Sequence, residues 1–414
     1  MGQAAARTAG ECALLQGIEP PDAGIKAPAS RPVAGPASVA ERTLRIGIVA
    51  SELPPGHGGM QEHARSLISC LSANHEIQLF TGAGSPTEPA SRNVSRHPVL
   101  HWHMTRDLAV LEGVRVDAWL TLNAGLASYS MGLRAPTFAY VHGNDFLRPW
   151  MPYPERRTRL AGVIGGEGVV ERWRRRQIAD GLQAARGIFS NSAFSRDLCA
   201  KLYGVPEERF SVIPPGIAPE FFQIGDPQPD PALRLITVSR LSAQSQRKNI
   251  DSVLRAVAML RDDMAIRYTV IGDGDDLPRL RALADALGIA DLVSFPGGID
   301  QQALVEAFAR HDAFILAVQP RQGDVEGFGM VFAQAGASGL PSIATAAGGI
   351  PEVVEEGQGG LLLDDVSPAG VAAGLRRFQG LRHSFDRAAI RSRAGRFSAE
   401  VCSLTMAGAI ARML

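Results

Sequence analysis

The stretch EGFGMVFAQA (residues 326–335) places an acid and two glycines between an apolar run and a helical pattern. The apolar run, Ala313 to Val318, is typical of a buried strand, and we expect the helix to begin at about Val331. Free backbone N–H groups at such a helix start favour anions and hydroxyl acceptors. Glu326 can bind hydroxyl groups there, although an acid before a helix is also a common capping preference. The stretch therefore predicts a strand–loop–helix unit with a ligand at its loop.

Strands and helices alternate on both sides of this stretch. Short apolar strands alternating with helices indicate parallel sheets that are covered on both faces. We therefore predict an α/β protein with two Rossmann-like, doubly wound parallel-sheet domains and a ligand in the cleft between them. The expected strands are Leu44–Val49, Ile77–Phe80, Ala118–Thr121, Thr137–Val141, Gly187–Ser190, Phe210–Ile213, Leu233–Val238, Tyr268–Ile271, Val293–Phe295, Ala313–Val318 and Pro341–Ala344. The expected helices include Asn249–Leu260, Leu277–Leu287 and Gln302–Ala309, with a helical region running to Leu414.

The domain organisation follows from length and from one linker. A chain of 414 residues is long for one core and favours two domains. The Pro- and Gly-rich stretch Pro214 to Pro231 is the best linker. We expect a disordered leader over 1–43, a first domain over 44–215 and a second over 216–382. Residues 383–414 are then a helical segment that packs back toward the first domain.

Composition excludes several classes of protein. A formal net charge of zero provides no field that would attract nucleic acid. No apolar run reaches the roughly 18–20 residues that cross a bilayer, so we expect a cytoplasmic protein. The four cysteines are far apart and show no spacing typical of a metal site or a disulfide framework: Cys12, Cys70, Cys199 and Cys402. We therefore expect no metal and a reducing compartment.

Two cations follow the strand that ends at Val238. Arg240 lies just past this strand and Lys248 just before the next helix, so both can point into the cleft. A guanidinium and an ammonium group suit a diphosphate, although two solvated loop cations are the alternative. Gly272-Asp273-Gly274 follows the next strand and is either an ordinary tight turn or a close approach to a ligand. It lacks the third glycine and the acid of a dinucleotide-binding fingerprint.

A second glycine pair follows the strand that ends at Ala344. Gly348-Gly349-Ile350-Pro351-Glu352 predicts a turn and then a helix with proline at its first position. The N-terminus of that helix would open onto the same cleft.

In this order, the motifs resemble those of the retaining glycosyltransferases of family four. The likeness is strong from Val212 to Leu363 and continues, more weakly, back to Leu44. It implies the GT-B fold, with a nucleotide-sugar donor mostly in the second domain and the acceptor mostly in the first. The resemblance implies that Arg240 and Lys248 hold the donor diphosphate and that Glu326 binds hydroxyls of the transferred sugar.

Further site residues are implied by the same resemblance. His142 would approach the reacting sugar, and the nucleotide base would lie near Phe295-Pro296-Gly297-Gly298. The catalytic set is then His142, Arg240, Lys248 and Glu326. The donor-binding set is Gly58, Gly59, Gly272, Gly274, Gly298, Gly327, Phe328, Gly329 and Gln334.

Gln334 departs from the family pattern. The family usually has two glutamates with seven residues between them. The first matches Glu326 and the second falls on Gln334, and the second normally binds ribose hydroxyls. Glutamine keeps an acceptor but loses the charge-assisted component, about 1 kcal/mol. Retention of anomeric configuration implies front-side attack, in which the leaving diphosphate helps to deprotonate the acceptor. No cofactor is implied beyond the nucleotide-sugar as co-substrate.

The resemblance predicts an enzyme that transfers a hexose to a glycan, lipid-linked or small-molecule acceptor. Three alternatives stay open: a sugar-nucleotide epimerase, a phosphorylase and a non-catalytic nucleotide-sugar-binding protein. The basic segment Glu155 to Arg176 offers either a solvated helix face or a peripheral contact with the inner face of an anionic membrane.

Overall fold

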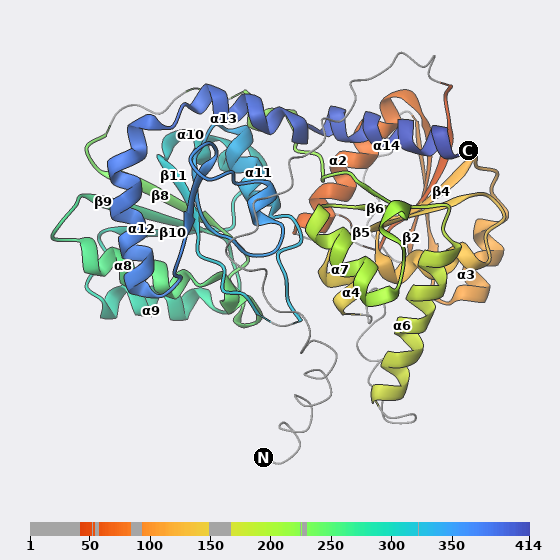
Figure 1. Cartoon of the computed structure of the whole chain (residues 1–414), viewed down its shortest axis with the longest axis horizontal. Helices are drawn as coiled ribbons and strands as arrows, with labels where there is room; N and C mark the ends of the chain where they lie inside the picture. The colour runs from red at the N-terminus through yellow and green to blue at the C-terminus, as the bar shows by residue number, and fades with distance from the viewer. Residues whose placement is uncertain are drawn as a thin grey trace. The chain divides into compact units, whose positions relative to one another are not determined.

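The computed structural model describes residues 42–51, 53, 58–83, 93–148, 167–223, 225, 230–321 and 323–414. This part of the chain forms two parallel sheets of seven and six strands, with helices on both faces of each (Figure 1). The prediction of two doubly wound α/β units is therefore confirmed. Residues 1–41, which make up most of the predicted leader, lie outside the described residues.

The first sheet has the order β3-β2-β1-β4-β5-β6-β7, and all of its neighbouring strands run parallel. The order changes direction between β1 and β4, where Ile46 pairs with Ala118. Ligands of doubly wound sheets bind outside the carboxyl ends of the strands at such a switch point. The strands are β1 (Arg45–Val49), β2 (Glu76–Gly82), β3 (Val94–Leu100), β4 (Ala118–Thr121), β5 (Thr137–Val141), β6 (Gly187–Ser190) and β7 (Phe210–Val212).

Alternating side chains divide the first sheet between two cores. Along β5, Phe138 and Tyr140 pack toward α2 (Gly59–Asn74) and α14 (Ala399–Met413), which lie side by side (Figure 1). Ala139 and Val141 face the opposite core. That core is formed by α4 (Asn144–Leu147), α6 (Glu167–Ala184) and α7 (Ala193–Tyr203). Helix α3 (Met104–Leu111) and the 3-10 segment η1 (Ala124–Met131) pack against β1 to β4. The last helix of the chain thus packs on the first sheet.

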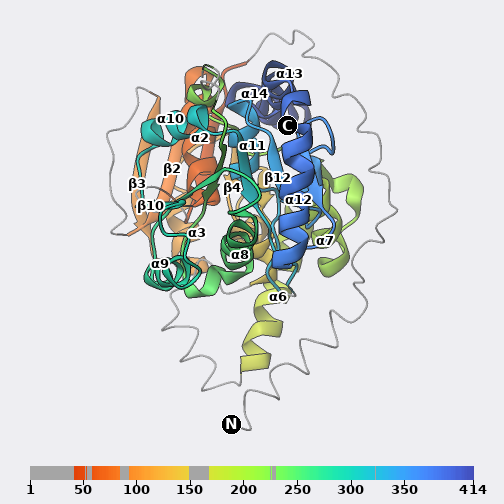
Figure 2. The same cartoon turned by 90° about the vertical axis from the view of Figure 1, so that its left-hand side faces the viewer.

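The second sheet has the order β10-β9-β8-β11-β12-β13, with its switch point between β8 and β11. Helices α8 and α9 lie on one side of it and α10 and α11 on the other (Figure 2). The strands are β8 (Leu233–Val238), β9 (Ile266–Ile271), β10 (Val293–Gly297), β11 (Ala313–Leu316), β12 (Ser342–Thr345) and β13 (Gly360–Leu363). The helices are α8 (Ile250–Leu260), α9 (Leu277–Ala286), α10 (Gln301–Arg310), α11 (Met330–Ala337), α12 (Pro368–Leu381) and α13 (Arg387–Ala394).

Two strands and one helix of the structure differ from the sequence predictions. β3 and β13 were not predicted; β3 carries polar residues and Pro98, and most of it is only partly buried. The predicted helix after Gly348-Gly349 is wrong, because the chain forms only a 3-10 turn, Ile350–Glu352. No α-helix therefore starts at this motif. The domain boundaries at 43/44, 215/216 and 382/383 stay a prediction.

No helix in the described part of the chain is both long enough and apolar enough to cross a bilayer.

Candidate functional site

The switch points bring the predicted site residues of the second domain together. β8 leads at its carboxyl end to Ser239 and Arg240, and β11 leads to the loop that contains Glu326. Since β8 and β11 are parallel neighbours, both loops leave the same edge of the sheet. The first sheet carries Gly58-Gly59 beyond β1 and His142 directly beyond β5.

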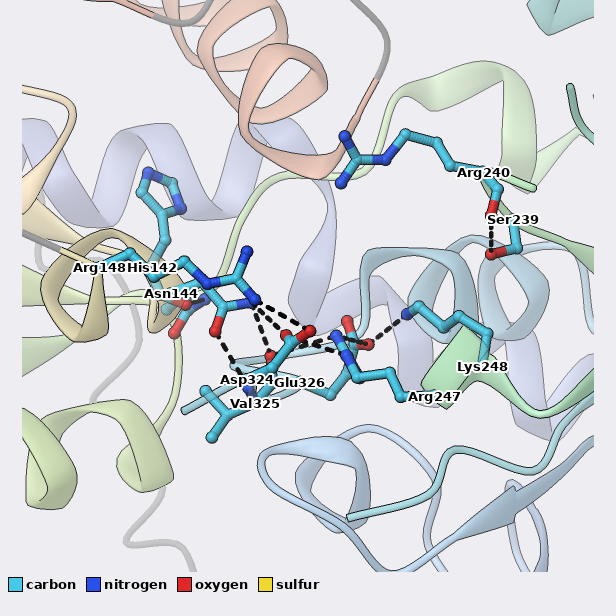
Figure 3. Close-up of polar contacts among 11 residues, drawn as sticks. His142, Asn144, Arg148, Ser239, Arg240, Arg247, Lys248, Asp324, Val325 and Glu326 are labelled. Carbon is cyan, nitrogen blue, oxygen red and sulfur yellow. Dashed lines mark hydrogen bonds and ion pairs between the residues drawn. The ribbon is translucent and has the colours of Figure 1, made fainter. Parts of the chain in front are cut away.

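Lys248 and Glu326 form an ion pair at this edge. The Lys248 ammonium group donates to Oε2 of Glu326, as Figure 3 shows. Arg247 Nη2 lies 3.4 Å from the same oxygen. Burial alone would raise the pKa of Glu326, but the charges of Lys248 and Arg247 outweigh it and hold that pKa below its ordinary value. Glu326 is therefore an ionised carboxylate that two cations hold in place.

Gly327 lies against the backbone of the first domain. A Cβ atom at this position would lie 2.0 Å from the His142 carbonyl oxygen and 3.0 Å from Nδ2 of Asn191. The Gly327 carbonyl accepts hydrogen bonds from the Ser192 hydroxyl and, at 3.3 Å, from the Ser195 hydroxyl at the start of α7. Glycine is needed here because two backbones meet, and this contact joins the predicted donor loop to the segment that carries His142.

The second glycine pair supports the first. A Cβ atom on Gly348 would lie 2.2 Å from the Glu326 carbonyl oxygen, and one on Gly349 would lie 2.2 Å from that of Gly327. Gly349 N donates to the Glu326 carbonyl at 2.8 Å. Glu352, at the end of the same motif, accepts hydrogen bonds from Ala193 N and Phe194 N, in the first turn of α7. The motif therefore fixes the position of residues 326–327 and joins it to the first domain.

Arg240 is the predicted site residue that the structure does not bring to Glu326. Its side chain is exposed and has no partner among the described residues, and its guanidinium group lies apart from the Lys248–Glu326 pair (Figure 3). The segment that carries it is fixed by glycines. A Cβ atom on Gly272 would lie 1.8 Å from the Ser239 carbonyl oxygen. One on Gly274 would lie 2.2 Å from the Leu241 carbonyl oxygen. Glycine is required at both positions because the two loops approach each other too closely to leave room for a side chain.

Three further predicted donor-binding positions lie near these loops. Gly298 lies beside the Gly272 loop, since a Cβ atom on it would be 3.8 Å from that of Asp273. Gly58 precedes α2 with φ of 156°, and a Cβ atom on Gly59 would lie 3.3 Å from Cγ of Met330, the first residue of α11. The start of α2 and the start of α11 therefore lie against each other.

Phe328, Gly329 and Gln334 complete the predicted donor loop. Phe328 is buried and makes an edge-to-face contact with Phe397, and this contact anchors the loop to the core of the second domain. Gly329 is the N-cap residue of α11 and has φ of 88°, in the left-handed region that favours glycine. Gln334 is half-buried on α11, and its side-chain amide has no hydrogen-bond partner among the described residues. Its predicted contact with a ribose stays a prediction.

His142 is buried in a polar setting at the end of β5. Its backbone N donates to Oδ1 of Asp145 at 2.9 Å, and its ring Nε2 lies 3.2 Å from the Leu122 carbonyl oxygen. Burial lowers the pKa of His142, so the imidazole is neutral at pH 7. A carbonyl only accepts, and the neutral ring therefore carries its proton on Nε2 and leaves Nδ1 as an acceptor.

A second buried histidine, His63, was missed by the sequence reasoning. It comes from α2 and is 2% exposed, and its ring centroid lies 4.4 Å from that of Tyr140 and 5.3 Å from that of His142. Neither of its ring nitrogens has a hydrogen-bond partner in the part of the chain that the structure describes. Burial, together with the neighbouring His142, lowers its pKa well below the ordinary value. Its spacing could have revealed it, because His63 shares the inward face of α2 with Leu67.

In the described ranges, no three His, Cys, Asp or Glu side chains are arranged to hold a metal ion.

Comparison with known proteins identifies the family. Residues 57–221 match the model described as Glycosyltransferase Family 4, and residues 223–393 match Glycosyl transferases group 1. The chain is 33% identical over 389 residues to a D-inositol 3-phosphate glycosyltransferase of Geodermatophilus obscurus, covering 87% of this chain and 79% of that protein. This chain belongs to the family-four glycosyltransferases. The predicted resemblance to this family is thereby confirmed, and the chain is an enzyme of the glycosyltransferase class.

Other family-four proteins and solved structures agree. A GDP-mannose-dependent alpha-(1-6)-phosphatidylinositol monomannoside mannosyltransferase of Mycobacterium tuberculosis is 28% identical over 395 residues, 85% of this chain and 92% of that protein. The sucrose-phosphate synthase of Thermosynechococcus elongatus superposes with a TM-score of 0.69 at 18% identity, covering 90% of this chain and 98% of that one. Anabaena HepE, solved with UDP and glucose, superposes with a TM-score of 0.64 at 17% identity, covering 89% of this chain and 100% of that one. These structures share the GT-B fold with this glycosyltransferase.

Proposed function

We propose that this glycosyltransferase moves a hexose from a nucleotide-diphosphate sugar to a hydroxyl of a glycan, lipid-linked or small-molecule acceptor, with retention of anomeric configuration. The observation that carries the proposal is the Lys248–Glu326 pair. It lies at the switch point of the second sheet, beside the loop in which Gly327 meets the His142 backbone. A cation suited to a phosphate and an acid suited to sugar hydroxyls thus lie next to the residue that meets the first domain.

The charges of the site suit the departure of a diphosphate. In the proposed mechanism Lys248 and the exposed Arg240 bind the two phosphates, and the free N–H groups at the start of α11 add a partial positive charge. These groups stabilise the negative charge that develops on the leaving oxygen. The acceptor hydroxyl attacks from the same face and passes its proton to that oxygen, which accounts for retention.

Glu326 and His142 then orient the transferred sugar. The ionised Glu326 carboxylate accepts hydrogen bonds from two sugar hydroxyls. His142 presents Nδ1 as a further acceptor, because its Nε2–H is directed to the Leu122 carbonyl. Gln334, one turn into α11, would contact the ribose of the donor.

A ligand panel on the wild type and on Gln334→Glu tests the function. We expect one of GDP-mannose, UDP-glucose and ADP-glucose to raise the melting temperature by several degrees, since a ligand at a hundred times its Kd adds about 2.7 kcal/mol. Gln334→Glu restores a charged ribose acceptor and should tighten that donor about fivefold, the equivalent of about 1 kcal/mol. The same donor must then be transferred to an acceptor, and phosphatidylinositol mannoside and inositol phosphate are the first to try because the relatives' names contain them.

Other outcomes of the panel contradict the proposal. Conversion of the donor without an acceptor would indicate an epimerase, and a requirement for inorganic phosphate would indicate a phosphorylase. Donor binding with neither hydrolysis nor transfer would mean that the chain binds nucleotide sugars without catalysis.

We also propose that the enzyme works in the cytoplasm, at the inner face of an anionic membrane. Trp173 and Val169, four residues apart on α6, are 56% and 53% exposed, and Arg172 and Arg176 are exposed beside them. This combination of apolar and basic groups suits an interfacial helix. Arg174 is not part of this surface, because it is buried and donates to the Gly125 carbonyl. Residues 155–166 of the predicted basic segment lie outside the described residues.

Vesicle sedimentation tests this membrane surface. Trp173→Ala should weaken binding to vesicles rich in anionic lipid at least tenfold, since burial of such a side chain contributes about 2 kcal/mol. Val401→Ala on α14, also an exposed apolar residue, is the matched control and should bind as the wild type does. Equal binding by the two variants would remove α6 from the proposal.

A further inference from the structure

Asp324 links the two domains beside the donor loop. Its carboxylate pairs with Arg247 Nε at 2.9 Å, within the second domain, and with Arg148 Nη2 at 3.1 Å, from the first. Asn144 Nδ2, also from the first domain, donates to Asp324 Oδ1 at 2.9 Å. Figure 3 shows these side chains converging on the segment that precedes Glu326.

Asn144 also holds the neighbouring backbone. Its amide nitrogen donates to the Val325 carbonyl at 3.1 Å, and its amide oxygen accepts from Val325 N at 3.0 Å. Asn144 is two residues beyond His142, at the start of α4. The segment that carries His142 is thereby fixed to the segment that carries Glu326.

Arg247 connects this link to the proposed donor site. Its side chain is 8% exposed, and a charge at that depth requires close partners. Its charged partners are two carboxylates: Asp324 through Nε at 2.9 Å and Glu326 through Nη2 at 3.4 Å. Nη2 also donates to the Val325 carbonyl at 3.4 Å. Lys248, by contrast, contacts Glu326 and is 19% exposed.

Donor binding changes the demands on these two cations. Under the proposed function, Lys248 turns its ammonium group to the incoming diphosphate. Glu326 is then buried with one fewer cation, and an uncompensated buried carboxylate would take up a proton or move. Arg247 cannot follow Lys248, because Asp324 holds it from the other side.

We propose that Arg247 is a positioning residue that keeps Glu326 ionised and in place while Lys248 binds the donor diphosphate. Asp324 aligns Arg247, and Asn144 of the first domain holds Asp324. This inference rests on the proposed function. It assigns a separate role to each cation of the Arg247-Lys248 pair: Lys248 serves the donor phosphates, and Arg247 serves the acid that orients the sugar.

The test separates donor binding from turnover. Arg247→Met should lower kcat at least about thirtyfold, while the Kd of GDP and UDP, measured without a sugar, changes less than threefold. Arg247→Lys restores one charge, although an ammonium cannot span both carboxylates, and should recover part of kcat. Asp324→Asn should lower kcat about fivefold or more, because it releases Arg247 and weakens the contact with the first domain.

The matched controls remove an equivalent pair elsewhere. Arg234 and Asp312 form a 2.9 Å ion pair of similar burial at the opposite end of β8 and β11. Arg234→Met and Asp312→Asn should lower the melting temperature comparably and leave kcat within about twofold. If Arg247→Met does not fold, Arg247→Lys and Asp324→Asn decide the question.

Two results would overturn different statements. If no nucleotide sugar is bound or transferred by the wild type, the proposed function is wrong. If the wild type transfers sugar but Arg247→Met and Asp324→Asn lose no more kcat than their controls, the positioning role of Arg247 is wrong. A thirtyfold rise in the Kd of GDP or UDP in Arg247→Met would also overturn it, since Arg247 would then bind phosphate.

Discussion

Lys248→Ala is expected to lower kcat/KM at least about a hundredfold, a loss of about 3 kcal/mol of transition-state stabilisation. The substitution removes the proposed phosphate ligand and also leaves the carboxylate of Glu326, which is 17% exposed, with Arg247 as its nearby cation. Breaking a buried pair by deleting one partner is costlier than the pair itself is stabilising. The Kd of the nucleoside diphosphate should therefore rise as well, which distinguishes Lys248 from Arg247.

The measurement is initial rates of transfer at saturating acceptor, with the melting temperature of each variant recorded. Lys201→Ala provides the same chemical change at an exposed position on α7 and should keep wild-type rates. Near-normal turnover by Lys248→Ala would exclude Lys248 from the donor site and with it the central observation of the proposed function.

Gly327→Ala should have an effect of similar size for a steric reason. Its Cβ atom would lie 2.0 Å from the His142 carbonyl oxygen, well below any real carbon–oxygen contact, so the loop has to move away from the first domain. That movement breaks the hydrogen bonds from Ser192 and Ser195 to the Gly327 carbonyl and separates Glu326 from His142. We expect transfer to fall at least about a hundredfold, since a 1 Å displacement at a catalytic site costs that much.

Affinity for the nucleoside diphosphate should fall less, because Lys248 lies outside the contact. Gly380→Ala in α12 is the control, since a Cβ atom there meets nothing within 4 Å and alanine favours a helix. Full activity of Gly327→Ala would mean that the contact between residues 142 and 327 is not required for transfer.

The alternation of strands and helices could be predicted because buried parallel strands are nearly continuous apolar runs. The strands Ala118–Thr121, Thr137–Val141 and Leu233–Val238 have the bounds that the sequence predicted. β3 could not be predicted in this way, because it carries serine, arginine and histidine beside Pro98 at the edge of its sheet. The helix expected at Pro351 failed because Gly349 and Glu352 make contacts with Gly327 and α7 that a single turn satisfies.

The sequence predicted several residues of the candidate site but not the contacts between them. The strand ends identified Lys248 and Glu326, and family resemblance assigned their roles. His63 and Arg247 were overlooked, since an inward histidine on a helix and an arginine in a loop have many ordinary explanations. Their burial and their neighbours, which are tertiary properties, distinguish them.

The sequence by itself determined the fold class, the family and the identity of the glycine positions, because local periodicity and motif order are written in consecutive residues. It could not determine why those glycines are needed or which acid meets which cation. Gly327 is needed because the His142 carbonyl approaches it from 185 positions earlier in the chain. Asn144, Asp324 and Arg247 meet because two separately formed sheets bring their carboxyl edges together. That meeting depends on packing over the whole chain, and only the tertiary structure decided it.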